Sequence, residues 1–285
     1  MRLALSLLVL SLSPLPARAQ SGPALPADQT RFEALYQLTF RPDSLAATTR
    51  REMMRLQLGS RLSRFESLNA LRSDSVMEAA FAQAERQKTA GENMTINLEG
   101  SGIQNFRSSF KEVIFKVPTA RQIAVYDKIG TVRYTYQEPA PGLTWTIMPG
   151  ATASIAGYAC QRATASYGGR TWEAWFAREV PLSDGPYKFY GLPGLIVKVS
   201  DSRQHFVYEL LKLRQLPTPA PLALPEAGAR PLAKAEFVRG KMEHERTAFE
   251  QMMANGNIRF GTPEQQEAAR QRARTRKPLN RPELR

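Results

Sequence analysis

The stretch Gly185-Pro-Tyr-Lys-Phe-Tyr-Gly-Leu-Pro-Gly-Leu-Ile-Val-Lys-Val199 is the part of this chain that most restricts its fold. Its first half contains the residues that set backbone direction: Gly185, Pro186, Gly191, Pro193 and Gly194. Glycine adopts positive φ without a steric penalty, and proline fixes φ and lacks a backbone donor. We therefore expect a structural turn at Gly191–Gly194. The apolar, β-branched second half predicts a buried strand over residues 195–200.

Further strands are predicted on both sides of this stretch by alternating apolar and polar residues. Residues 32–40 form one such strand, and similar patterns occur at 50–58, 61–67, 112–116, 121–127, 132–137, 143–148, 155–167, 171–179 and 206–213. A helical period predicts one inserted helix over 67–88 and one C-terminal helix over 233–256. The expected fold class is α+β, with a mainly antiparallel sheet. We expect that sheet to be strongly curved or partly closed, which would protect its edges, with a helix on its concave side.

The first 19 residues have the features of a secretory signal peptide. A basic start at Arg2 precedes a short apolar run, and small residues surround an expected cleavage point after Ala19. The run is shorter than the roughly 20 residues that span a membrane, and no other run is long enough. We expect a periplasmic or secreted protein with no transmembrane span in the mature chain.

The rest of the chain divides by composition. Residues 20–215 are expected to form the β-rich domain, and five prolines in 216–232 predict a linker. The C-terminal helix occupies 233–256, and the Arg-rich residues 257–285 predict a disordered basic tail. That tail is a candidate contact for an anionic surface.

Composition excludes some classes of protein. Of the 285 residues 42% are hydrophobic, so the chain can bury a core. Loss of Arg2 and Arg18 with the signal peptide would lower the net charge from +13 to +11. Such a charge favours acidic surfaces, but no nucleic-acid partner is expected because the chain has no binding motif for one. The single cysteine, Cys160, cannot form a disulfide within the chain.

Several motifs occur together with Gly-Leu-Pro-Gly-Leu-Ile at residues 191–196. They are Ile155-Ala-Gly-Tyr-Ala-Cys-Gln-Arg-Ala163, Gly169-Arg170-x-Trp172-x-Ala-Trp175-Phe, Glu179-Val-Pro181 and Gly185-Pro-Tyr-Lys-Phe189. As a set they resemble the GLPGLI family of secreted proteins, which is widespread in the Bacteroidota and has no settled activity. The resemblance covers roughly residues 30–215. It implies an envelope location and supplies no catalytic residues.

The loop Gly185–Gly194 and nearby side chains are the candidate ligand- or partner-binding site, because binding residues often lie on loops held by a rigid scaffold. The candidates are Arg170, Trp175, Tyr187, Phe189, Tyr190, Leu192 and Pro193. These aromatics could instead be cross-strand pairs within a β core. The spacing of Trp172 and Trp175 puts them on opposite faces. The charges of Glu173, Glu179 and Lys188 are interpreted as surface ion pairs.

Three functional hypotheses remain open. The first is a non-enzymatic envelope protein that binds a peptide, a lipid or a partner protein through this loop. The second is a thiol-dependent hydrolase using Cys160 with His205, although a lone cysteine is also typical of a small buried hydrophobe. The third is a structural accessory of an outer-membrane assembly that makes contact through the basic tail. With only two histidines and no ligand cluster, no metal and no cofactor are expected.

Overall fold

A computed structural model describes residues 25–87, 101–140, 142–223, 228–254, 271 and 280–283, without the side chains of 104 and 248–254. The expected signal peptide and most of the expected tail lie outside the described residues.

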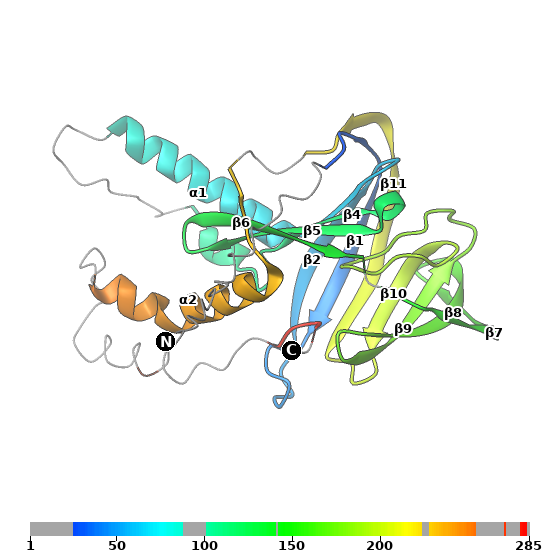
Figure 1. Ribbon diagram of the computed structural model, residues 1–285. Helices are drawn as coiled ribbons and strands as arrows, with labels where there is room; N and C mark the ends of the chain where they lie inside the picture. Colours follow the sequence, from blue (N-terminus) through cyan, green and yellow to red (C-terminus); the bar gives the residue numbers. More distant parts are fainter. Residues whose placement is uncertain are drawn as a thin grey trace, which may run out of the picture.

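Twelve strands of the described chain form one sheet in the order β12-β6-β5-β4-β3-β2-β1-β11-β10-β9-β8-β7 (Figure 1). Their bounds are β1 Gln29–Phe40, β2 Arg50–Leu58, β3 Ser63–Ser67, β4 Val113–Val117, β5 Gln122–Ile129, β6 Val132–Pro139, β7 Thr146–Ile155, β8 Tyr158–Tyr167, β9 Arg170–Ala177, β10 Leu195–Asp201, β11 Phe206–Pro221 and β12 Arg230–Pro231. The paired strands are antiparallel except β12 and β6, which are parallel. The expected mainly antiparallel sheet is therefore confirmed, and the described chain is mostly β.

The sheet is open, with β7 and β12 at its edges. The expected partial closure is therefore wrong, and the structure does not support strong curvature. Both edges are protected in other ways: β12 has only two residues, and the pairing of β7 with β8 shifts register between Ile147 and Thr152. Short or irregular edge strands discourage pairing with another chain.

Two helices accompany the sheet, as expected. Helix α1, Leu68–Gln87, directly follows β3, and α2, Lys234–Ala254, follows β12. Figure 1 shows both to one side of the long central strands. In α2, Phe237 packs its ring 5.3 Å from that of Tyr136 on β6. Within the described residues neither helix combines the length and apolar character that a membrane crossing requires. Two short 3-10 turns, η1 Ile103–Phe106 and η2 Pro118–Ala120, flank β4.

Strand β11 extends beyond the end predicted from the sequence. It pairs with β1 as far as Pro221, so residues 216–221 belong to the sheet and not to a linker. Prolines 217 and 219 fall where the pairing of β11 with β1 is interrupted, between the pairs Gln215–Phe32 and Ala220–Thr30. Proline is tolerated at such irregular positions, where no ladder bond is needed from its nitrogen.

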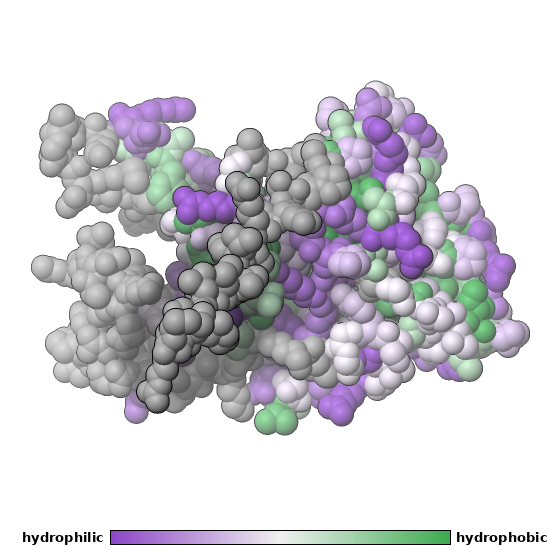
Figure 2. All heavy atoms as spheres, in the orientation of Figure 1, coloured by the Kyte–Doolittle hydropathy of each residue, from purple (hydrophilic) through white to green (hydrophobic). Residues whose placement is uncertain are grey.

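One face of the central strands forms the core. Ala34, Tyr36, Leu38 and Phe40 of β1 are all almost completely buried, in agreement with their alternation. On the face that Figure 2 shows, hydrophilic and hydrophobic residues are interspersed over the described strands, as expected when alternate side chains face outward.

Candidate functional site

The loop of residues 178–194 packs onto the sheet. Residues 184–189 are buried, and the Tyr36 hydroxyl donates a hydrogen bond to the carbonyl of Ile196, just after the loop, at 2.8 Å. At its end, Gly191 and Gly194 have φ of +93° and +152°. A Cβ on Gly194 would lie 2.1 Å from the Ala177 carbonyl oxygen, which explains glycine at that position.

The aromatics expected to line an open groove are mostly core residues. Phe189 is completely buried, and its ring lies 4.6 Å from that of Trp172 and 5.9 Å from that of Tyr167. Trp175 lies half-buried on the opposite face of β9, where its indole N–H donates to Glu173 at 3.0 Å. Most of these aromatics therefore pack in the β core, the alternative stated above, and do not line an open groove.

The remaining candidates at the turn play structural roles. The carbonyl of Tyr190 accepts a hydrogen bond from the indole of Trp145 at 2.9 Å. Leu192 is buried, and Pro193 is exposed. Pro186 is buried and its carbonyl accepts from the Phe189 N–H at 3.1 Å.

A buried ion pair fixes the loop to β4. The Lys116 ammonium contacts the Asp184 carboxylate and donates to the Gly185 carbonyl at 2.5 Å. Burial lowers the pKa of Lys116, although Asp184 opposes this effect. The pair holds the loop across the sheet.

A short stretch of the chain end, Asn280–Glu283, lies against this loop and is called the C-terminal segment below. Figure 1 shows it beside the central strands. The expected disordered tail spans 257–285, and of it the structure describes residues 271 and 280–283. The docking site comprises the residues that contact the segment together with Glu138, which pairs with Lys188 and Lys234. The contacting residues are Arg41, Pro42, Glu112, Gly168, Arg170, Tyr187, Lys188, Lys234 and Glu245.

Asn280 is held through its backbone and its side chain. Its N–H donates to the Pro42 carbonyl at 2.9 Å, and its side-chain amide donates to the Arg41 carbonyl at 3.1 Å. The guanidinium of Arg170 donates to the Asn280 side-chain oxygen at 2.8 Å and to the Arg281 carbonyl at 3.0 Å. Arg170 is itself fixed by Asp201 at 3.0 Å.

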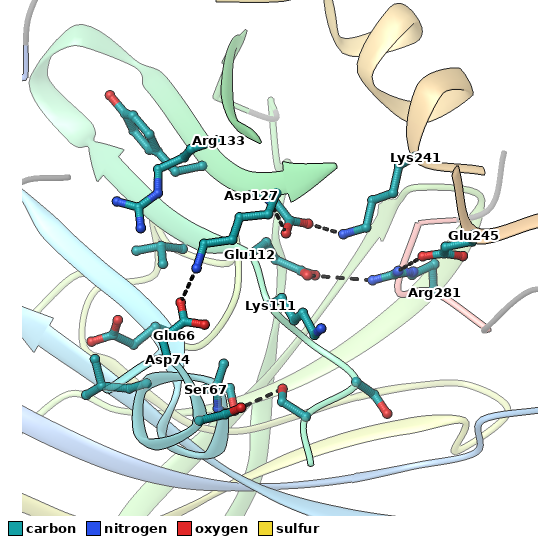
Figure 3. A pocket seen from close by; sticks show the side chains of 18 of the residues that line it. Glu66, Ser67, Asp74, Lys111, Glu112, Asp127, Arg133, Lys241, Glu245 and Arg281 are labelled. Carbon is teal, nitrogen blue, oxygen red and sulfur yellow. Dashed lines mark hydrogen bonds and ion pairs between the residues drawn. The ribbon is translucent and has the colours of Figure 1, made fainter. Parts of the chain in front are cut away.

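The next two residues continue the contact. The Arg281 guanidinium lies 3.6 Å from Glu112 and 3.5 Å from Glu245 of α2, as Figure 3 shows. Pro282 is buried. The segment therefore extends from Arg170 toward α2.

Glu283 enters the most strongly charged part of the docking site. It accepts from the Tyr187 hydroxyl at 2.6 Å, from Lys188 at 2.5 Å and from Lys234 at 2.8 Å. Both lysines also contact Glu138 of β6. Burial alone would raise the pKa of Glu283, but Lys188 and the hydrogen bonds outweigh it and lower the pKa to about 2.

Tyr187 adopts an unusual backbone conformation beside this carboxylate. Its φ is +54°, which is uncommon for a large side chain. Such conformations persist where the surroundings fix them and cluster at functional sites. Here the conformation accompanies the contact of the hydroxyl with Glu283.

The thiol hypothesis lacks the required geometry. Cys160 on β8 pairs with Ala177 at one end of the β8–β9 ladder. At the other end Tyr167 pairs with Arg170, and the His205 ring lies 3.3 Å from the Arg170 guanidinium. Seven residues of strand separate the two ends, which is about 23 Å at roughly 3.3 Å per residue. Burial also raises the pKa of the Cys160 thiol. We do not retain this hypothesis.

Two hollows adjoin the C-terminal segment. A cavity of about 270 Å³ next to Asn280 is lined partly by Arg170, Arg203 and His205. A wide cleft of about 3440 Å³ lies between the sheet and the helices, and Arg281 lines it. Figure 3 shows the cleft, where Lys241 of α2 is directed at Asp127 of β5. Among the described residues, no group of three or more His, Cys, Asp or Glu is arranged to hold a metal ion.

Sequence reasoning found only part of the docking site. It named Arg170 and Tyr187, but it interpreted Lys188 as a surface charge, although its side chain is only 2% exposed. It did not name Glu138, Lys234 or the C-terminal segment. The one sequence feature that pointed to the site was Lys188, which lies between two aromatic residues in a stretch that packs onto the sheet.

A family model described as "Protein of unknown function (Porph_ging)" matches residues 168–198, which include Arg170 and Lys188. A search of curated proteins found no match. Two similar solved structures are described as "Structure of PNGF-II in P21 space group" and "Structure of PNGF-II in C2 space group". The first has 12% identity and a TM-score of 0.49, and the second 13% and 0.48. Each match covers 76% of this chain but only 34% and 33% of the solved chains, so this chain spans about a third of their length.

Proposed function

We propose that this protein is a non-enzymatic binding protein of the cell envelope that recognises a short polypeptide segment at the docking site. The observation that carries the proposal is the seating of Asn280–Glu283, in which the backbone and three polar side chains each have partners. In the proposal, residues 280–283 fill the docking site here, and a segment of another protein can bind in the same place. The periplasmic or secreted location and the kinship to GLPGLI proteins belong to the same proposal.

The site has the features of a peptide-binding site. Recognition of a peptide combines main-chain hydrogen bonds with pockets for side chains. Here Pro42 and Arg170 contact the segment backbone, while Arg170, the lysines and Tyr187 receive its side chains. A lipid tail is a poorer occupant, because charged and hydrogen-bonding groups dominate these contacts.

The test uses the full chain with residues 280–283 replaced by glycine: Asn280→Gly, Arg281→Gly, Pro282→Gly and Glu283→Gly. A labelled, N-acetylated peptide of residues 280–285 is titrated in and its fluorescence anisotropy recorded. A tethered segment has an effective concentration in the millimolar range, so it competes strongly with free peptide. We expect the four-glycine variant to bind the peptide at least about tenfold more tightly than the unaltered chain does.

If neither the four-glycine variant nor the unaltered chain binds the peptide measurably, the proposal is contradicted. A second measurement does not depend on the folding of the variant. In the unaltered chain, millimolar peptide should increase hydrogen exchange at residues 280–283, and unchanged protection would also contradict the proposal.

A further inference from the structure

The docking site has two poles of opposite charge. An acidic pole is formed by Glu112 and Glu245, which receive the Arg281 guanidinium. A basic pole is formed by Lys188 and Lys234 with the Tyr187 hydroxyl, and these receive Glu283. Pro282 is buried between the two charged residues of the segment.

Without the segment, neither pole is neutral. At the basic pole two ammonium groups share one carboxylate, that of Glu138, and the Lys188 side chain is only 2% exposed. At the acidic pole, the Arg281 guanidinium pairs with both Glu112 and Glu245, so its removal leaves two carboxylates without this cation. Buried charges require partners, so the empty site favours a ligand with one positive and one negative side chain.

The backbone contacts fix the direction of the ligand. The Asn280 N–H donates to Pro42, and the carbonyl of Arg281 accepts from Arg170, so the chain runs from β1 and β9 toward the basic pole. A ligand with the opposite order would place a carboxylate at Glu112 and a cation at Lys188. Juxtaposed like charges are the usual means of rejecting a wrong partner.

Building on the proposed function, we propose that the docking site selects a segment in which a basic side chain precedes an acidic one by two residues. The partner is a protein or peptide that displays this order of charges in an accessible stretch. Charge order and spacing provide the selectivity, and the buried proline position favours a small or cyclic side chain between them.

Three N-acetylated peptides test this selectivity against the four-glycine variant. The first is Asn-Arg-Pro-Glu-Leu-Arg, the second exchanges the charges as Asn-Glu-Pro-Arg-Leu-Arg, and the third replaces glutamate with glutamine. We expect the glutamine peptide to bind about tenfold more weakly and the exchanged peptide about a hundredfold more weakly, from the strength of hydrogen bonds to charged groups.

A site variant checks that the basic pole causes the difference. Adding Lys234→Gln, whose side chain is 39% exposed, should reduce the glutamate-to-glutamine ratio severalfold. The matched control, Lys198→Gln, removes a lysine that pairs with Glu209 and should leave the ratio unchanged. If the three peptides bind equally, the charge-order proposal is wrong while peptide binding stands. If none binds, the proposed function fails, and this inference fails with it.

Discussion

At the scale of single residues, Gly194 shows how local geometry dictates residue type. Its φ of +152° disfavours other residues, and a Cβ would meet the Ala177 carbonyl oxygen at 2.1 Å. Glycine here lets the 178–194 loop end against β9 and start β10 without a clash.

We therefore expect Gly194→Ala to lower the free energy of unfolding by about 2–3 kcal/mol, in the range for overpacking. The matched control is Gly191→Ala, where φ is +93° but no atom lies within 4 Å of the added Cβ. It should cost about 1 kcal/mol from backbone strain alone. Denaturant unfolding measures both, and equal losses would refute the role of the Ala177 contact.

Lys116 gives a second prediction at this scale. Lys116→Met leaves the Asp184 carboxylate buried without its cation, and such losses cost about 3–5 kcal/mol. The double variant Lys116→Met with Asp184→Asn removes both charges, so it should be more stable than the single variant. Chemical denaturation of the two proteins tests this, and a double variant less stable than Lys116→Met would contradict the account.

At the scale of elements, the C-terminal segment connects parts of the structure that are distant in sequence. Glu283 and Lys188 are 95 residues apart, and Lys188 belongs to the loop while Lys234 begins α2. Within it, the contact of Glu283 with the two lysines depends on the charge of the Glu283 carboxylate.

The pH dependence of docking follows from the lowered pKa of Glu283. Its pKa falls from the ordinary 4.5 to about 2 when docked. A lowered pKa means that docking is fully favoured above about pH 4.5 and weakens as the pH falls toward 2. An NMR titration of the Glu283 carboxyl carbon should give a midpoint near 2. A midpoint near 4.5 would show an undocked segment, and Lys234→Gln should shift the midpoint upward.

At the scale of the whole molecule, the sequence was most informative where structure is local. The alternation in β1 identified both the strand and its buried face, because side chains alternate sides along any strand. Alternation does not reveal what covers a face, so Phe189 and Tyr187 were candidates for a binding site or for the core. Both lie in the 178–194 loop and are buried. The prolines of β11 resembled a linker, because their tolerance in a strand depends on where its pairing is interrupted.

The docking site could not be predicted as a unit, for a related reason. Nothing in the residues around Glu283 indicates that it meets Lys188 and Lys234, because these contacts depend on the folded arrangement of distant segments. An Arg-rich stretch is usually solvated, and residues 280–283 depart from that expectation through specific partners.

The sheet should remain folded without the segment, because the apolar core lies within the strands and the 178–194 loop. We expect the four-glycine variant to keep its circular dichroism spectrum and to melt only a few degrees lower, as for a loss of roughly 1–2 kcal/mol. Loss of a cooperative melting transition would instead make the segment an integral part of the fold.

The most direct test of the central claim is a crystal structure of the four-glycine variant with the peptide of residues 280–285. We predict peptide density along the docking site, with its asparagine at Arg170 and its glutamate carboxylate between Lys188 and Lys234. An empty docking site at saturating peptide, or a peptide bound elsewhere on the molecule, would contradict the claim that this site recognises a polypeptide segment.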